Sequence, residues 1–212
     1  MQTTATAEAS TFPRLLLKHA TERPGAPAMR EKEYGIWQTR SWADMATLVE
    51  HLACGLHQAG LQRGEHMIVV GANRPRLSAT MLAAQALGAI PVPLYQDAAA
   101  AECVFPITNA EVRFCLVEDQ EQVDKMLEVR ESCPQLAHIY YDDPRGLRNY
   151  HEAGLTALDD LLTAGKSFAA SHPTFFKDEV AKAHATDVAA MFFTSGTTGN
   201  PEGVVHTHSS LI

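Results

Sequence analysis

The sequence has no closely spaced cysteine pair and little positive charge. Its four cysteines, Cys54, Cys103, Cys115 and Cys133, form no CxxC motif, so neither a zinc site nor a disulfide framework is predicted. A reducing cytoplasm is the expected location. The 17 lysines and arginines stand against 25 acidic residues, for a formal net charge of −8. This balance opposes general attraction to nucleic acid or anionic lipid, so a polyanion site must be local.

Signals for export and membrane spanning are also missing. Residues 1–11 carry no basic cluster and no apolar run, which predicts a disordered tail rather than a signal peptide. The uncharged stretch Leu77–Gln96 is about long enough to cross a bilayer. However, Pro91 and Pro93 would break a helix there, so a buried helix followed by a buried strand is predicted. The 46% hydrophobic content is enough for a substantial core.

Short apolar runs alternate with helical stretches from His66 onward. The runs MIVVG, AIPVPL, RFCLV and HIYY are typical of strands, and helices are expected from about Pro75, Ala98 and Asp119. Pro106 should kink or shorten the second of these helices. The alternation predicts an α/β fold with a mostly parallel sheet and helices on both faces.

Other elements flank this alternating region. Apolar residues at helical spacing predict helices over Phe12–Arg23 and Trp42–Ala59, with the extended segment IWQTRSW just before the second. Downstream, TALDDLLTAG and PTFFKDEVAKA are predicted to be helical. VAAMFFT, from Val188, is predicted to be a buried strand.

That last strand leads into residues 192–208, FFTSGTTGNPEGVVHTH. Ligands of parallel sheets bind beyond the carboxyl ends of strands. Glycines here let the backbone approach a ligand closely, and hydroxyls add donors beside the N–H groups, as in a phosphate cradle. The glycines are Gly196, Gly199 and Gly203, and the hydroxyl residues are Thr194, Ser195, Thr197 and Thr198. A flexible surface turn of the same composition is the alternative.

Three other site types are weaker matches to this stretch. A P-loop needs four residues between its glycines and then Lys-Ser/Thr, whereas GTTG is followed by Asn200 and Pro201. A serine nucleophile elbow needs glycine where Phe193 stands. His206 and His208 alternate along an expected strand and could share a metal, but no third ligand lies nearby in the sequence, so no metal site is predicted.

FFTSGTTGNPEGVVHTH resembles the phosphate-binding signature of the adenylate-forming enzymes, which include acyl-CoA synthetases, firefly luciferase and peptide-synthetase adenylation domains. The stretch from Trp37 to Leu94 resembles the amino-terminal region of the same enzymes. GAIPVPLYQDA and VVHTHSSL look most like bacterial long-chain fatty acyl-CoA ligases. The resemblance implies that residues 12–212 are the amino-terminal portion of the large AMP-binding domain, an incomplete part of the adenylate-forming fold.

The resemblance also implies a two-step reaction. A carboxylic acid, expected to be a fatty acid, attacks the α-phosphate of ATP to give an acyl-adenylate, and the thiol of coenzyme A then displaces AMP. Mg²⁺ accompanies the nucleotide. By position, the residues expected to wrap the β- and γ-phosphates are Thr194, Ser195, Gly196, Thr197, Thr198 and Gly199. His208 falls where packing rather than chemistry is expected.

Two departures from the family pattern bear on activity. Glu202 stands where lysine is usual, which should weaken ATP binding. The chain also stops at Ile212, before the adenine pocket, the ribose-binding aspartate and the lid with its catalytic lysine. Catalytic residues are therefore expected beyond this segment, and the 212-residue chain alone should be inactive. The alternatives are a noncatalytic, truncated or divergent phosphate-binding or association domain, an aryl or short-chain acid substrate, and a carrier protein as acceptor.

Overall fold

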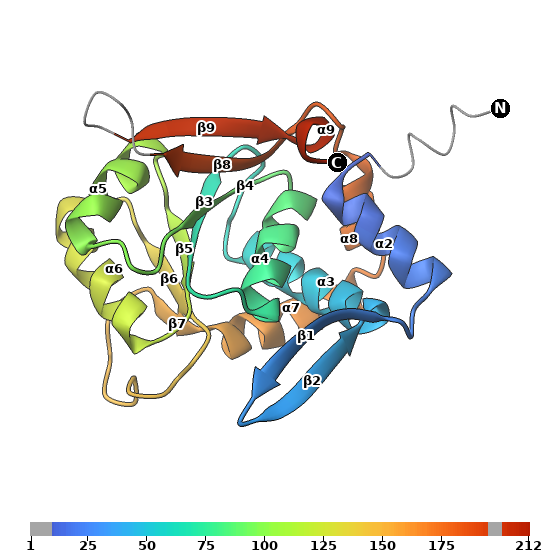
Figure 1. The fold of residues 1–212 in the computed structure, drawn as a ribbon, viewed down its shortest axis with the longest axis horizontal. Coiled ribbons are helices and arrows are strands. Elements are labelled where there is room, and N and C mark those ends of the chain that lie inside the picture. The colour runs from blue at the N-terminus through green and yellow to red at the C-terminus, as the bar shows by residue number, and fades with distance from the viewer. Residues whose placement is uncertain (1–9, 195–200) are drawn as a thin grey trace.

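A computed structural model describes residues 10–194 and 201–212 (Figure 1). The helices are α2 (Phe12–Glu22), α3 (Trp42–Gln58), α4 (Pro75–Ala86), α5 (Ala100–Asn109), α6 (Gln120–Ser132), α7 (Leu158–Ser171), α8 (Phe175–Ala181) and α9 (His208–Leu211). The strands are β1 (Pro27–Glu33), β2 (Ile36–Ser41), β3 (His66–Val70), β4 (Ile90–Leu94), β5 (Phe114–Val117), β6 (His138–Tyr141), β7 (Leu155–Ala157), β8 (Val188–Thr194) and β9 (Glu202–Thr207).

Five strands form the central sheet, in the order β4-β3-β5-β6-β7. All four pairings between them are parallel, which confirms the predicted α/β class. The chain moves from β3 outward to β4 and then returns past β3 to β5. This reversal is a topological switch point, where the crossover helices change face.

Alternating side chains of the sheet form two separate cores. Met67 of β3 and Phe114 of β5 face a core built with α2, α3, α4, α7 and α8. Their neighbours Ile68 and Cys115 face a second core built with α5 and α6. Period-two alternation with apolar residues at every position gives a sheet buried on both faces. The expectation of helices on both faces is therefore confirmed.

Two antiparallel hairpins lie outside the central sheet. β1 pairs with β2 through a tight turn in which Tyr34 and Gly35 have φ values of 47° and 82°; positive φ at both central residues is typical of hairpin turns. β8 pairs with β9, and β8 also lies beside β4. Figure 1 shows the β8–β9 hairpin along the top of the molecule and β1–β2 at the bottom.

Most predicted elements are present, with several corrections. Leu77–Gln96 contains most of α4 and all of β4, and no helix in the described part of the chain is long and apolar enough to cross a membrane. Pro106 lies inside α5. The sequence patterns missed β1 and the three-residue strand β7. They also ended the helix of TALDDLLTAG at its glycine, whereas α7 continues to Ser171.

Gly165 lies inside α7, at its contact with α3, and does not end the helix. A Cβ atom there would lie 1.8 Å from the carbonyl oxygen of His51 in α3 and 2.7 Å from the backbone nitrogen of Gly55. Gly55 is also constrained, though less tightly, because its Cβ would lie 2.5 Å from the carbonyl oxygen of Leu161 in α7. The absence of side chains at these two positions lets α3 and α7 approach at backbone distance.

Candidate functional site

The β8–β9 hairpin holds the two described ends of the predicted phosphate cradle. Thr194 is the last residue of β8 and Glu202 the first residue of β9, and the two are register partners. Both are exposed. The other predicted cradle residues, Ser195, Gly196, Thr197, Thr198 and Gly199, lie outside the described residues. Thr194 and Glu202 thus stand opposite each other where the two strands meet the predicted cradle.

Glu202 places a negative charge at this position. Among the residues that the structure describes, no lysine, arginine or histidine forms an ion pair with its carboxylate. Gly203, the next residue, is the register partner of Phe193, and a Cβ there would lie 2.2 Å from Cε of Met191. The hairpin end therefore combines close strand packing with an uncompensated carboxylate.

His206 and His208 do not lie on one strand, so the expectation that they alternate along a strand is wrong. His206 belongs to β9 and makes an edge contact with Phe192, with ring centroids 5.7 Å apart. His208 instead begins α9 and is 1% exposed. Its Nδ1 accepts a 3.3 Å hydrogen bond from the backbone N–H of Phe12. His208 packs the carboxyl-terminal segment against α2, as expected from the sequence.

The burial of His208 affects the protonation of its imidazole. Burial lowers the pKa of its imidazole below the ordinary value of 6.5, while nearby Asp187 opposes that shift. The accepting Nδ1 requires an unprotonated nitrogen at that position. Within the described chain, no group of three His, Cys, Asp or Glu side chains could hold a metal ion.

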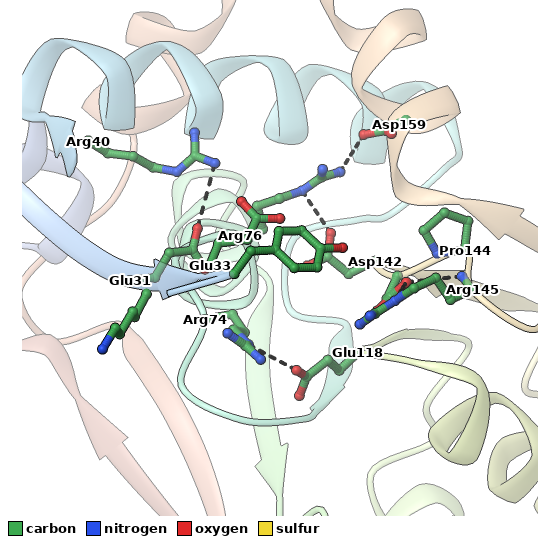
Figure 2. A pocket seen from close by; sticks show the side chains of 13 residues that line it. Glu31, Glu33, Arg40, Arg74, Arg76, Glu118, Asp142, Pro144, Arg145 and Asp159 are labelled. Carbon is green, nitrogen blue, oxygen red and sulfur yellow. Dashed lines mark hydrogen bonds and ion pairs between the residues drawn. The ribbon is translucent and has the colours of Figure 1, made fainter. Parts of the chain in front are cut away.

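A second feature, not predicted from the sequence, is a charged pocket of about 520 Å³ at the carboxyl ends of the central strands (Figure 2). It is lined by Glu31, Lys32, Glu33, Tyr34, Arg40, Arg74, Arg76, Glu118, Asp142, Asp143, Pro144, Arg145 and Asp159. The residues come from the β1–β2 hairpin and from the segments that follow β3, β5, β6 and β7. The available sequence signal was a charged lining residue soon after three of the four apolar runs, namely Arg74 after MIVVG, Glu118 after RFCLV and Asp142 after HIYY.

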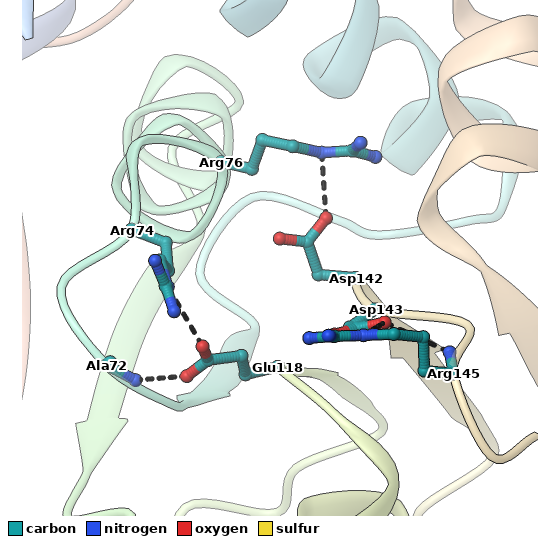
Figure 3. Close-up of polar contacts among 7 residues, drawn as sticks. All are labelled: Ala72, Arg74, Arg76, Glu118, Asp142, Asp143 and Arg145. Atoms are coloured by element: carbon teal, nitrogen blue, oxygen red, sulfur yellow. Dashed lines mark hydrogen bonds and ion pairs between the residues drawn. The ribbon is translucent and has the colours of Figure 1, made fainter. Parts of the chain in front are cut away.

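Glu118 lines this pocket at the switch point between β3 and β5, and Figure 3 shows its contacts with Ala72 and Arg74. One carboxylate oxygen accepts a 2.6 Å hydrogen bond from the backbone N–H of Ala72, and the other lies 3.0 Å from Nε of Arg74. Both donors belong to the turn between β3 and α4. An internal carboxylate thus binds the turn that could otherwise present donors to an anionic ligand.

Arg76 links three elements on the other side of the pocket. Its Nε lies 2.8 Å from Oδ1 of Asp142, just after β6, and its Nη2 lies 2.6 Å from Oδ1 of Asp159, in the first turn of α7. Burial raises the pKa of Asp142, and Arg76 opposes that shift. Nearby, hydrogen bonding to Arg145 lowers the pKa of Asp143. Arg74 and Arg76 pair with carboxylates of distant segments and so cross-link the tertiary structure, whereas the Arg145–Asp143 pair is local.

The chain is similar to known proteins in both sequence and structure. The family described as "AMP-binding enzyme" matches residues 16–212. The long-chain-fatty-acid–CoA ligase FadD15 of Mycobacterium bovis is 27% identical over 198 residues, which are 93% of this chain and 31% of that protein. The long-chain-fatty-acid–CoA ligase ACSBG2 of Homo sapiens is 28% identical over 187 residues, which are 87% and 27%. The chain thus spans less than a third of the length of these curated relatives.

Solved structures share the fold. The anthranilate CoA ligase AuaEII, in complex with anthranoyl-AMP, superposes with a TM-score of 0.77 at 19% identity, over 93% of this chain and 35% of that chain. The inhibitor-bound N-terminal domain of FACL13 from Mycobacterium tuberculosis superposes with a TM-score of 0.70 at 24% identity, over 93% and 44%. At these identities the likeness establishes the fold alone.

Proposed function

Because the chain belongs to the AMP-binding enzyme family, we propose that it carries the phosphate-binding part of an ATP-dependent ligase. In this proposal a carboxylic acid is activated to an acyl-adenylate and then transferred to coenzyme A. The family match over residues 16–212, which includes the whole glycine- and hydroxyl-rich stretch, is the observation that carries the proposal. The ligase names of the relatives support a fatty acid as substrate.

The β- and γ-phosphates of ATP are proposed to lie against Thr194 and the following residues Ser195, Gly196, Thr197, Thr198 and Gly199. When the acid attacks the α-phosphate, negative charge grows on the departing pyrophosphate. Donors that are already oriented offset this charge without waiting for solvent to reorganise. Thr194 supports this role because it is exposed at the end of β8.

Mg²⁺ is proposed to accompany the nucleotide and to neutralise phosphate charge. It keeps several waters and is usually bound through one or two carboxylates together with phosphate oxygens. A rival to the expected weakening of ATP binding by Glu202 is that its exposed carboxylate, opposite Thr194, supplies an oxygen ligand to this ion. The described residues supply no cluster of three ligands, so the phosphates and water would complete the coordination.

Calorimetric titration of the 212-residue chain with pyrophosphate and with MgATP tests the proposed site. Replacing Thr194 with valine should weaken pyrophosphate binding about tenfold, because a hydrogen bond to a charged group is lost. Thr39→Val, at an exposed threonine of β2, is the matched control and should bind normally. No binding by the unsubstituted chain, or equal binding by Thr194→Val, would refute the site.

The chain by itself is proposed to form no acyl-CoA. It covers 31% of FadD15, and the family's remaining parts would supply the rest of the nucleotide and acyl sites. The expected result is no acyl-CoA from ATP, palmitate and coenzyme A, with a host strain lacking fatty acyl-CoA ligase excluding contamination. Turnover by the purified chain would contradict this. Pyrophosphate exchange by a longer polypeptide containing the segment, with fatty, aryl and short-chain acids, would identify the acid class.

A noncatalytic phosphate-binding or association domain is the second candidate, and Glu202 favours it. Within the described part of the chain its carboxylate has no cationic partner, and such a charge opposes polyphosphate binding. This candidate requires weak MgATP binding and no pyrophosphate exchange by any longer form. For either candidate a cytoplasmic location is proposed, supported by four free, buried cysteines.

A further inference from the structure

β8 is attached to the body of the protein at both of its ends. At its beginning, Nε2 of Gln85 in α4 donates a 2.7 Å hydrogen bond to the carbonyl oxygen of Ala189. At its far end, the ring of Phe193 makes an edge contact with the ring of Phe105 in α5, with centroids 6.2 Å apart and an interplanar angle of 89°. Figure 1 shows α5 near the end at which β8 terminates.

The Gln85 side chain binds a backbone carbonyl group of β8 at the point where the β8–β9 pairing is irregular. Val188 pairs with Thr207 and Ala190 with His206, so the register slips at Ala189. Such a bulged residue has no partner in the ladder. Ala189 is fully buried, and Gln85 is only 6% exposed. A buried amide and a buried carbonyl each need a partner, and here they bind each other across 104 residues of sequence.

The Phe105 contact acts next to the proposed phosphate site. Phe193 directly precedes Thr194, and it packs against the core that contains α5 and α6. The two attached residues, Ala189 and Phe193, are four residues apart in one strand, or about 13 Å. Together with the pairing to β9 and the position beside β4, these two fixed points help to hold β8 in place, and so the position at which Thr194 is presented.

We propose that Gln85 and Phe105 are positioning residues for phosphate binding. The inference rests on the proposed function, because it assigns these two residues the task of holding Thr194 at that site. Neither residue need touch the nucleotide. The competing interpretation is that both contacts stabilise the fold without affecting the affinity for phosphate.

The test compares Gln85→Met with Thr80→Val in the 212-residue chain. Methionine keeps the approximate volume of glutamine and removes its donor. Thr80 is also fully buried in α4, but its hydroxyl donates to the carbonyl oxygen of Arg76 within the same helix. Pyrophosphate affinity of the folded protein should fall about tenfold in Gln85→Met, because small displacements of oriented donors are costly, and should remain unchanged in Thr80→Val at comparable melting temperature.

Two substitutions of Phe105 test whether its aromatic ring is needed for pyrophosphate binding. Phe105→Leu should weaken pyrophosphate binding severalfold, whereas Phe105→Tyr retains the ring and should bind like the unsubstituted chain. Hydrogen exchange provides a readout that does not depend on the ligand. Protection of the β8 amides from Ala190 to Thr194 should fall about tenfold in Gln85→Met, while protection of α6 is unchanged.

The outcomes separate this inference from the proposed function. Unchanged pyrophosphate affinity in both Gln85→Met and Phe105→Leu would overturn the inference while leaving the phosphate site in place. Absence of pyrophosphate binding by the unsubstituted chain would refute the proposed function instead. In that case, unchanged exchange along β8 in Gln85→Met would independently overturn the anchoring role.

Discussion

At the scale of single residues, Glu202 and His208 show how one side chain can set the behaviour of a segment. Both were conspicuous in the sequence, the first as an acidic residue in a glycine- and hydroxyl-rich stretch and the second as part of a histidine pair. The structure places Glu202 at the exposed end of a hairpin and His208 in a buried contact with Phe12. Their predicted effects are accordingly on ligand affinity and on stability.

Replacing Glu202 with lysine should raise MgATP affinity at least tenfold, with Glu202→Gln intermediate. At about 5 Å and an effective dielectric near 20, a unit charge pair is worth about 3 kcal/mol before screening. The differences should shrink as salt increases. Titration calorimetry at two ionic strengths measures this, and equal affinities for all three forms would be incompatible with the electrostatic role. If the carboxylate instead recruits Mg²⁺, binding to the unsubstituted form should depend more steeply on Mg²⁺ than binding to Glu202→Gln.

His208 should make the fold sensitive to mild acid. Its folded pKa is lowered by burial, so below the ordinary value of 6.5 the unfolded chain binds more protons than the folded chain. The contribution of neutral His208 to the stability is therefore fully present above about pH 6.5 and is lost as the pH falls toward the lower pKa of the folded state.

Melting temperatures between pH 7.5 and pH 5 test this contribution. His208→Gln keeps a hydrogen-bond acceptor for Phe12 and cannot titrate, so it should have a shallower decline over this range. His66 and His138, whose pKa values burial also lowers, should retain part of the slope. An unchanged slope in His208→Gln would rule out its contribution.

At the scale of elements, the α3–α7 crossing depends on two glycines. Gly165 lies inside α7, where alanine would favour the helix by about 1 kcal/mol on propensity alone. The structure predicts the opposite sign, because a Cβ atom there would meet the backbone of His51 at 1.8 Å. Backbone atoms cannot rotate away as a side chain could.

Gly165→Ala should therefore lower the free energy of unfolding by about 1–3 kcal/mol, in the range of overpacked cores. Gly55→Ala should act in the same direction, since its Cβ would meet the carbonyl oxygen of Leu161. Lys166→Ala, at the exposed neighbouring position, is the control and should have little effect. Urea denaturation measures all three, and stabilisation by Gly165→Ala would show that the helices are not in backbone contact.

At the scale of the whole molecule, the charged pocket joins segments that follow different strands of the parallel sheet. Arg76 joins three of these segments, because its ion pairs connect the start of α4 with the segment after β6 and with α7. Arg76→Met should cost about 2 kcal/mol of unfolding free energy, since it leaves the half-buried Asp142 carboxylate without its partner.

Two further variants test whether the lost unfolding free energy comes from the unpaired Asp142 carboxylate. Asp159→Asn should change stability by less than about 0.5 kcal/mol, because the Asp159 side chain is 72% exposed. Combining Arg76→Met with Asp142→Leu should recover most of the loss, because no unpaired charge remains. A double variant no more stable than Arg76→Met would place the cost elsewhere.

The sequence by itself determined the α/β class, the order of most helices and strands, and the family resemblance. These depend on local patterns: a short apolar run such as MIVVG indicates a buried strand without reference to distant segments, and residues 194–199 are contiguous in the chain. The family match over residues 16–212 confirms the resemblance, while the phosphate-binding roles of these residues remain predictions.

Only the tertiary structure decided which distant segments meet. The same glycine that is typical of a helix end is a crossing point at Gly165, because α3 happens to lie against it. The partner of Gln85 is 104 residues away, and the pocket collects charges that follow separate strands. Sequence periodicity indicates which side of an element is buried, but packing against other elements selects the contacts made there, and those contacts determine where Thr194 is held.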